Sequence, residues 1–295
     1  MKYIYYPGCS LEGTAAEYNI STKAVLNALG AELVELEDWT CCGATAAEGV
    51  SHLLSFALPA RNLAAAEKMK IKCDILVPCS ACYLNLKRVE REIREDPSLF
   101  KKINQVLETE NLVLKGTLKS RHLMDVLASD VPAADIAEKV VHPMTGLRIA
   151  PYYGCQCLRP YAVFDDPEEP TTMEPVIKAL GASVHEWDMG GRCCGASLMS
   201  TAPEAGIELV AELLDAAQGA DAVATVCPMC QMNLEAYQKR ASKLRHTHYE
   251  IPILYLPQLM GLAMGLPGDQ VRLDLNLCVP DDFRRKLPDA RPAQM

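Results

Sequence analysis

The sequence predicts an α/β protein with two similar domains, related by a pseudo-twofold axis, each a mostly parallel sheet flanked by helices. Short apolar runs alternate with amphipathic segments, which is typical of parallel sheets that carry helices on their faces. The whole order occurs twice, with cysteines at matching places in both copies. The repeat places one domain at residues 1–130, a linker at 131–146, a second domain at 147–270 and a tail at 271–295.

Each copy opens on an apolar run that ends in Gly-Cys. The run "YIYYPGC" ends at Cys9, and the run "IAPYYGC" ends at Cys155. Both predict a buried strand that presents a cysteine at its carboxyl end. We expect a helix next, over residues 15–30 and 171–181, because each segment has apolar residues on one side and ends in a capping glycine.

The later elements of the two copies also match. A second strand, "AELVELED" or "ASVHEWD", leads to Cys-Cys-Gly-Ala, and a helix follows over residues 50–70 or 204–217. A third strand, "DILVP" or "AVATV", leads to Cys-x-x-Cys and an amphipathic helix, "YLNLKRVEREIRE" or "QMNLEAYQKRASKL". Each copy closes on a strand and a helix, "NLVLKG" with "SRHLMDVLAS" or "IPILYLP" with "QLMGLAMG". The cysteines therefore fall at carboxyl ends of strands, where open α/β sheets bind their ligands, and at helix N-termini, which favour thiolates.

Composition narrows the function classes. The 295-residue chain has a net charge of -9 with scattered basic residues, which does not favour nucleic acid as a partner. Its first residues have no sustained apolar region of the kind found in signal peptides, so we expect a cytoplasmic protein whose thiols stay reduced. Thirteen cysteines in such a chain indicate metal binding or redox chemistry.

The repeat sorts the cysteines. Ten of them occupy matched positions, with spacings C-x31-CC-x36-C-x2-C and C-x37-CC-x32-C-x2-C. They are Cys9, Cys41, Cys42, Cys79 and Cys82 in the first copy, and Cys155, Cys193, Cys194, Cys227 and Cys230 in the second. Cys73, Cys157 and Cys278 have no partner in the other copy, so we expect them to be small apolar residues and not ligands.

Five matched cysteines per copy indicate an iron–sulfur cluster. A structural zinc site closes at four ligands, and adjacent cysteines suit an object with several metal atoms. A thioredoxin-like dithiol pair would leave three cysteines per copy unexplained. Zinc in at least one half stays an alternative.

The doubled pattern resembles the cysteine-rich "CCG" domain and, over residues 3–265, the two-copy form in the B subunit of heterodisulfide reductase. The opening "YYPGCS" and the closing "YLPQLMGLAMG" are similar to that protein. The resemblance implies one non-cubane [4Fe–4S] cluster per half, held by its five matched cysteines. It also implies a catalytic subunit that reduces a mixed disulfide, in methanogens that of coenzyme M and coenzyme B, to two thiols. Electrons would come from a ferredoxin-like iron–sulfur subunit and a flavin-bearing subunit, often fed by a hydrogenase or formate dehydrogenase.

A second function stays open. The same domain occurs in iron–sulfur subunits of glycolate, lactate and glycerol-3-phosphate dehydrogenases, although these often carry an attached ferredoxin domain that this chain lacks. No side chain is assigned as a catalytic acid or base, since the six histidines are scattered. Arg159 and Arg192 are candidates for the anionic ends of a substrate, because they lie close in sequence to matched cysteines.

Overall fold

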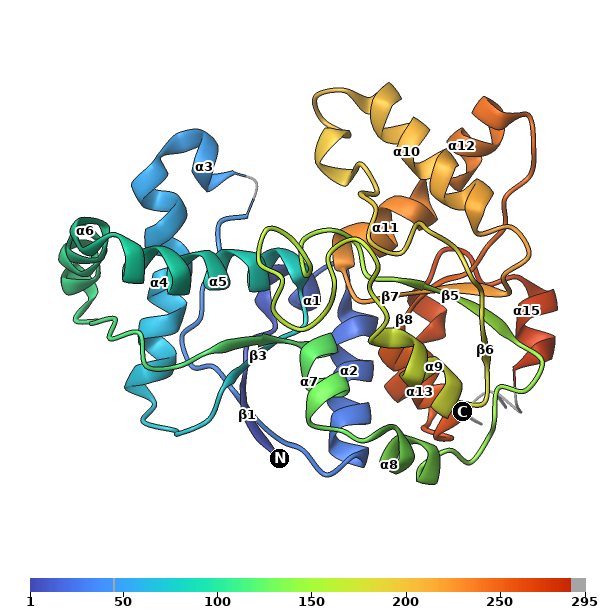
Figure 1. The fold of residues 1–295 in the computed structure, drawn as a ribbon, viewed down its shortest axis with the longest axis horizontal. Helices are drawn as coiled ribbons and strands as arrows, with labels where there is room; N and C mark the ends of the chain where they lie inside the picture. Colours follow the sequence, from blue (N-terminus) through green and yellow to red (C-terminus); the bar gives the residue numbers. More distant parts are fainter. Residues whose placement is uncertain (45, 288–295) are drawn as a thin grey trace.

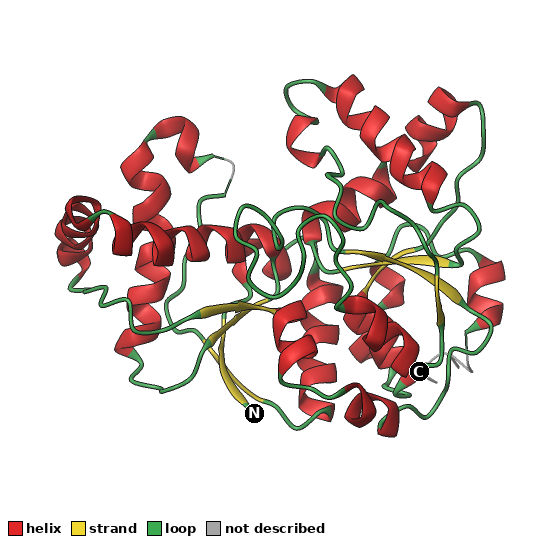
Figure 2. Cartoon of the chain, in the orientation of Figure 1, coloured by secondary structure: helices red, strands yellow, loops and turns green. Residues whose placement is uncertain are grey.

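The computed structural model describes residues 1–44 and 46–287, and it confirms the predicted α/β class. Two four-stranded sheets lie side by side with helices around them (Figures 1 and 2). All strand pairs are parallel. The strands are β1 (Lys2–Tyr5), β2 (Glu32–Glu35), β3 (Ile75–Val77) and β4 (Ser120–His122) in the N-terminal half, and β5 (Arg148–Tyr152), β6 (Ser183–Val184), β7 (Ala222–Thr225) and β8 (Ile253–Tyr255) in the C-terminal half.

The two sheets have the same topology. Their strand orders are β2-β1-β3-β4 and β6-β5-β7-β8, so the first strand of each half lies between the second and the third. Ile4 of β1 pairs with Val34 on one side and Ile75 on the other, and β5 lies in the same way between β6 and β7. The central strands are buried on both faces, because helices cover both sides of a parallel sheet.

The helices follow the strands in the order that the repeat predicts. The N-terminal half has α1 (Gly8–Glu12), α2 (Ala16–Ala28), α3 (Ala47–Val50), α4 (His52–Lys68), α5 (Ser80–Glu95), α6 (Pro97–Leu107) and α7 (Leu123–Ser129). The C-terminal half has α9 (Met173–Ala179), α10 (Pro203–Ala216), α11 (Pro228–Ala236), α12 (Gln238–Arg245) and α13 (Leu256–Ala263). The expected linker contains α8 (Ala133–Glu138), and the expected tail contains α15 (Asp281–Lys286) and begins at the end of α14 (Gly268–Val271).

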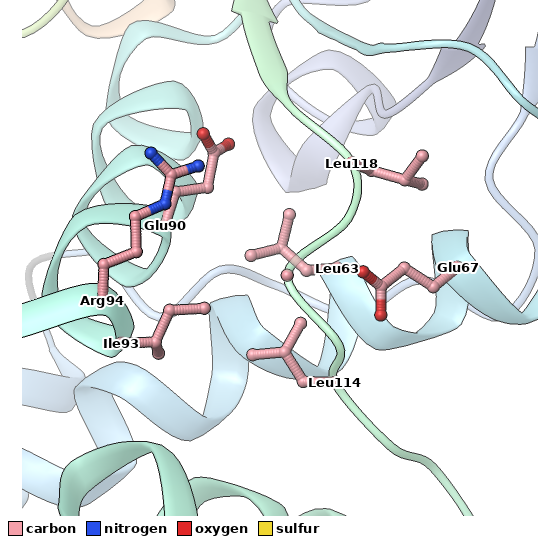
Figure 3. A pocket seen from close by; sticks show the side chains of 8 residues that line it. Leu63, Glu67, Glu90, Ile93, Arg94, Leu114 and Leu118 are labelled. Atoms are coloured by element: carbon pink, nitrogen blue, oxygen red, sulfur yellow. The ribbon is translucent and has the colours of Figure 1, made fainter. Parts of the chain in front are cut away.

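The predicted fourth strand of the N-terminal half is misplaced. Residues 111–116 form an extended loop, and β4 lies instead at Ser120–His122, where a helix was expected. The Glu67 carboxylate accepts hydrogen bonds from the backbone N–H groups of Lys115 and Thr117, each at 2.6 Å, and so replaces a neighbouring strand as the partner of this loop. Figure 3 shows Glu67 beside Leu114 at a cavity of about 10 Å³, which has room for about one water molecule.

The helix expected after the second Cys-x-x-Cys is also different, because it is broken into α11 and α12 at Tyr237. The Gln238 side chain at the break pairs with the backbone of Ile251 in both directions, at 2.7 and 2.9 Å. This pairing fixes the start of α12 against the segment that leads into β8, so the second helix takes a direction of its own.

The two halves share a core. Helix α2 of the N-terminal half packs against α13 and α14, and the rings of Tyr18 and Tyr255 stack with centroids 4.2 Å apart. The rings of His122 and Phe164 form a second stack between the halves, with centroids 5.9 Å apart. Among the described residues, no helix has the length and apolar character needed to cross a membrane.

Candidate functional site

The structure brings the five matched cysteines of the N-terminal half together. The Sγ atoms of Cys9 and Cys41 lie 3.7 Å apart, although the two residues belong to different strand–helix turns. The Cys42 thiol is within hydrogen-bonding reach of both Cys41 and Cys82, and Cys82 is within reach of Cys79. The five thiols therefore form one continuous group at the carboxyl edge of the first sheet.

The C-terminal half repeats this group. The Cys155 and Cys193 thiols are within hydrogen-bonding reach of each other, and the Cys230 thiol reaches both Cys194 and Cys227. All of these cysteines are free thiols. In each half the parallel strands all point toward one edge of the sheet. The cysteines therefore meet there, although they come from the end of the first strand, the Cys-Cys-Gly turn and the start of the Cys-x-x-Cys helix.

Each group has an open side and a closed side. Cys9, Cys41 and Cys193 are exposed and Cys155 is partly exposed. The second cysteine of each adjacent pair and both cysteines of each Cys-x-x-Cys motif are buried. A cofactor bound to either thiol group would therefore be held from the protein interior and would be accessible from the side of the first two cysteines.

Hydrogen bonding between the thiols lowers the pKa of some and raises that of their partners, such as Cys41 and Cys155, and the thiols with a lowered pKa are the ones most ready to bind metal. The pKa of Cys42 is lowered to about 3, mainly by hydrogen bonding with the Cys41 thiol and then with Cys82. Hydrogen bonding with Cys155 lowers the pKa of Cys193 to about 6. Each thiol group therefore favours a shared negative charge, which suits a cationic metal cluster.

A tyrosine three residues before the first cysteine holds the Cys-Cys-Gly turn in each half. The Tyr6 hydroxyl donates to the Thr40 carbonyl at 2.8 Å, and the Tyr152 hydroxyl donates to the Arg192 carbonyl at 2.9 Å. Both carbonyls belong to the residue just before a cysteine pair. The tyrosine thereby fixes the distance between the first strand and the turn that carries two thiols.

An asparagine three residues after each Cys-x-x-Cys motif supports the same turn from the other side. The Asn85 side-chain amide donates to the Cys42 carbonyl at 3.0 Å, and the Asn233 amide donates to the Cys194 carbonyl at 2.7 Å. These asparagines link the helix start to the cysteine pair, so three separate segments are held in one arrangement.

Two glycines allow the chain to approach a buried thiol closely. Gly8 and Gly154 directly precede the first cysteine of each half and have φ values of +71° and +74°. A Cβ atom would lie 2.7 Å from the Cys82 sulfur at Gly8 and 2.9 Å from the Cys230 sulfur at Gly154. Only glycine fits both the conformation and the space.

The sequence interpretation missed the tyrosine and asparagine pairs. Their signal was present, because both copies contain Tyr-x-x-Cys at the first cysteine and Cys-x-x-Cys-x-x-Asn at the last. It went unused because a hydroxyl or amide that binds a backbone carbonyl has no characteristic spacing of its own.

The unmatched cysteines lie outside both groups. Cys157 is buried, and its thiol donates to the Tyr153 carbonyl at 3.2 Å. Cys73 comes just before β3, at the amino end of a strand whose carboxyl end leads to Cys79. Cys278 lies in the tail, where its backbone N–H donates to the Glu235 carboxylate at 3.1 Å.

The two candidate arginines have different surroundings. The Arg159 guanidinium donates to the Pro167 carbonyl at 2.6 Å and also to Gly191, so it clamps the loop after Cys155. Arg192 is exposed, forms no ion pair within the described parts of the chain, and lines a groove of about 810 Å³. Arg192 is therefore the one of the two with a free charge.

The thiol groups fit a polynuclear cluster better than a single ion. Within residues 1–44 and 46–287, no three His, Cys, Asp or Glu side chains converge closely enough to hold one metal ion. A cluster does not need such convergence, because each thiolate bonds a different metal atom.

The comparisons agree with this geometry. The cysteine-rich domain family termed CCG matches the chain twice, at residues 3–87 and 149–235, which together carry all ten matched cysteines. The chain belongs to this CCG family. Both family segments cover the first three strands of a sheet together with the cysteine turns described above.

Relatives with names of their own align over nearly their full length. The chain is 36% identical over 94% of its length to the 8-methylmenaquinol:fumarate reductase membrane anchor subunit of Wolinella succinogenes, covering 96% of that protein. It is 30% identical over 92% of its length to a protein of Archaeoglobus profundus that is named as similar to the B subunit of heterodisulfide reductase, covering 93% of it. It is 26% identical, over 97% of both chains, to the B subunit of the ferredoxin:CoB-CoM heterodisulfide reductase of Methanosarcina mazei.

A solved structure shares the fold. The crystal structure of a hypothetical protein from Helicobacter pylori superposes with a TM-score of 0.74 over 95% of this chain, at 16% identity. The chain spans about half of that protein, 52% of its length. These relationships place the chain in the CCG family, with relatives that are named as subunits of reductases.

Proposed function

We propose that this chain is the catalytic subunit of a heterodisulfide reductase, which reduces a mixed disulfide to two thiols at two iron–sulfur clusters. The observation that carries the proposal is the pair of five-thiol groups, one per half, each open on the side of its first cysteine. The coenzyme M–coenzyme B heterodisulfide, or a similar mixed disulfide, is the proposed substrate class.

The five matched cysteines of each half would hold one non-cubane [4Fe–4S] cluster. When bound, the clusters supply two electrons and iron sites that accept sulfur. The overall reaction takes up these two electrons and two protons, breaks one S–S bond and yields two thiols. The chain's own part is to fix each site rigidly, through the Tyr6 and Tyr152 hydroxyls and the Asn85 and Asn233 amides. Two rigid sites would in turn hold a bound disulfide in position, and such positioning of a reactant lowers the activation barrier by as much as about 7–11 kcal/mol.

Substrate binding would use the free charge of Arg192. Its exposed guanidinium lies in sequence next to Cys193, whereas Arg159 is occupied by backbone carbonyls and Glu168. A carboxylate, sulfonate or phosphate end of the disulfide is the chemistry that a guanidinium recognises. Electrons would arrive from a ferredoxin-like iron–sulfur subunit, itself supplied by a flavin-bearing subunit, with a hydrogenase or formate dehydrogenase as the source.

The first test is cofactor content. Anaerobically purified chain should contain iron and acid-labile sulfide for two clusters, and Cys9→Ser and Cys193→Ser should each damage only one. Zinc in place of iron in either half would contradict the proposal.

The second test concerns the reaction. Electron paramagnetic resonance of the oxidised protein should respond to each thiol product separately, one thiol perturbing the cluster of one half and the other thiol that of the other half. If both thiols perturb the cluster of one half alone, the other cluster only relays electrons and the two-site mechanism is wrong.

A second candidate function rests on the Wolinella succinogenes relative, whose name places it in a menaquinol-oxidising fumarate reductase. In that case the chain would pass electrons within a dehydrogenase or reductase complex and perform no disulfide chemistry. Purification of the native complex discriminates between the two functions. If its subunits include a flavoprotein that acts on succinate or fumarate, and if neither cluster responds to thiols, the chain transfers electrons only.

A further inference from the structure

Hydroxyls of the N-terminal half form hydrogen bonds with backbone carbonyls that lie next to both thiol groups. The Tyr18 hydroxyl of α2 lies 3.1 Å from the Pro78 carbonyl and 3.1 Å from the Val226 carbonyl. Pro78 directly precedes Cys79, and Val226 directly precedes Cys227. A single buried hydroxyl therefore reaches the entry to the Cys-x-x-Cys motif in both halves.

A second hydroxyl also crosses to the C-terminal half. The Ser80 Oγ, on the first residue of α5, lies 3.2 Å from the same Val226 carbonyl. Tyr18 and Ser80 are both fully buried, so no bulk water competes for these contacts. The carbonyl next to Cys227 thus lies within reach of two hydroxyls of the opposite half, and the single Tyr18 proton is shared between this carbonyl and that of Pro78.

His122 sets the direction of the Ser80 hydroxyl. The backbone N–H of Met124 donates to His122 Nδ1 at 3.2 Å, which leaves the proton on Nε2. Nε2 then donates to Ser80 Oγ at 3.1 Å, so the Ser80 proton is free to point at the C-terminal half. The Phe164 ring stacks on the imidazole and holds it in this orientation.

Among residues 147–287, no side chain of the C-terminal half donates to the carbonyl before Cys79 in return. Phe164 is the ninth residue after Cys155, as Tyr18 is the ninth after Cys9, and it has no hydroxyl. Each of these two rings stacks on the residue that ends the fourth strand of the other half. Pro228 stands where the N-terminal half has Ser80, and its side chain offers no donor.

We propose that the Tyr18 and Ser80 hydroxyls form a one-way junction through which the N-terminal half raises the reduction potential of the cluster held by Cys227. This inference rests on the iron–sulfur clusters of the proposed function and concerns two positioning residues, not ligands. A reduced cluster carries more negative charge, and hydrogen-bond donors beside its ligands stabilise that charge. Without them the Val226 carbonyl would present an unpaired negative partial charge beside Cys227.

The donors that face the two sites differ. The carbonyl before Cys227 faces hydroxyls of the opposite half, whereas Phe164 and Pro228 offer no side-chain donor in return. The junction therefore makes the two sites unequal although their ten cysteines match, and it favours the C-terminal site as the final electron acceptor.

The test uses the full chain with both clusters, in redox titrations followed by electron paramagnetic resonance. Signals are assigned to each half with the Cys9→Ser and Cys193→Ser variants. Ser80→Ala should shift the one-electron equilibrium of the C-terminal cluster about tenfold toward the oxidised form, a fall of ~59 mV in its midpoint. The N-terminal midpoint should stay unchanged.

Matched variants separate the hydroxyl from its surroundings. Ser80→Thr keeps a hydroxyl and should keep the wild-type midpoint. Tyr18→Phe keeps the ring and its stack on Tyr255. It should lower both midpoints, because the same hydroxyl reaches the carbonyls before Cys79 and Cys227. Its C-terminal midpoint tests the inference if Ser80→Ala does not load its clusters. An unchanged C-terminal midpoint in a loaded variant, or equal shifts of both midpoints with Ser80→Ala, would overturn the inference. Wild-type protein without iron and sulfide would overturn the proposed function instead.

Discussion

Cys155 and Cys157 are two residues apart and have opposite surroundings. The Cys155 thiol meets Cys193 at the open side of the C-terminal group, whereas Cys157 is packed among core residues of both halves. Burial raises the pKa of the Cys157 thiol, whereas the pKa of Cys155 is raised mainly by hydrogen bonding with the Cys193 thiol, whose own pKa is lowered. The position of one side chain relative to the sheet edge therefore separates a candidate ligand from a core residue.

We expect Cys157→Ser to keep both clusters. A serine hydroxyl can still donate to the Tyr153 carbonyl, which the thiol reaches at 3.2 Å. The visible absorption and iron content should match the wild type, while Cys155→Ser as the matched variant should lose the cluster of the C-terminal half. A cluster lost through the Cys157 change would show that this residue is a ligand after all.

His122 should make stability depend on pH. Burial lowers its pKa to about 4 from the usual 6.5, against a weaker opposing effect of Asp125. The unfolded chain therefore binds the proton at a higher pH than the folded chain. Stability is complete above pH 6.5 and falls as the pH drops toward 4, by up to about 3 kcal/mol.

The measurement is the denaturant midpoint at pH 7.5 and pH 5 for the wild type and His122→Gln, both loaded with clusters. Glutamine does not titrate, so the variant should lose less stability between the two pH values. Cluster loss by acid affects both proteins alike and cancels in this comparison. Equal losses would mean that His122 does not control the pH response.

The strand-to-helix turns are the elements that build the sites. In each half, β1 or β5 is followed within three residues by a glycine with positive φ and then a cysteine, and the chain there runs against a buried thiol of the Cys-x-x-Cys motif. These turns are short and tightly packed, so they leave little freedom to the thiols that they carry. A substitution in such a turn should therefore act on the cluster site before it acts on the fold.

Gly8→Ala should abolish the cluster of the N-terminal half and leave that of the C-terminal half. The added Cβ would lie 2.7 Å from the Cys82 sulfur, a contact that requires the thiol to move. Gly30→Ala is the matched control, because Gly30 has a φ of +78° and nothing within 4 Å of the added atom. That control should cost about 1 kcal/mol of stability from backbone strain and keep its iron. Equal iron contents in the two variants would contradict a steric role of Gly8.

The two halves and their two sites are built on a shared apolar core. A single apolar core includes residues from β1 through the tail and contains side chains of both halves, while a smaller core lies within the C-terminal half alone. Phe283 and Leu287 of the tail are buried in the shared core as well. The junction between the thiol groups is therefore enclosed by apolar contacts from both sides.

We expect Tyr255→Ala to destabilise both halves together. Tyr255 is fully buried and stacks on Tyr18 of the other half, so its removal leaves a cavity in the shared core that costs roughly 3–5 kcal/mol. Both cluster signals should be lost at one lowered denaturant concentration. Tyr249→Ala, in the core of the C-terminal half alone, should affect the C-terminal signal first. Independent loss of the two signals with Tyr255→Ala would show that the halves do not share a core energetically.

The sequence by itself determined the α/β class, the duplication and the ten cysteines that meet, because parallel strands of a repeated unit carry their last residues to one edge. It placed most helices as well, since their apolar faces and capping glycines are local signals. It could not place β4, because Ser120–His122 becomes a strand by pairing with β3 and has no apolar pattern of its own. The surroundings of Arg159 and the junction of Tyr18, Ser80 and His122 were decided by the tertiary structure alone. For Arg159, Tyr18 and Ser80 the partner is a backbone carbonyl of a distant segment, and a carbonyl is the same at every residue, so no pattern of side chains could reveal it.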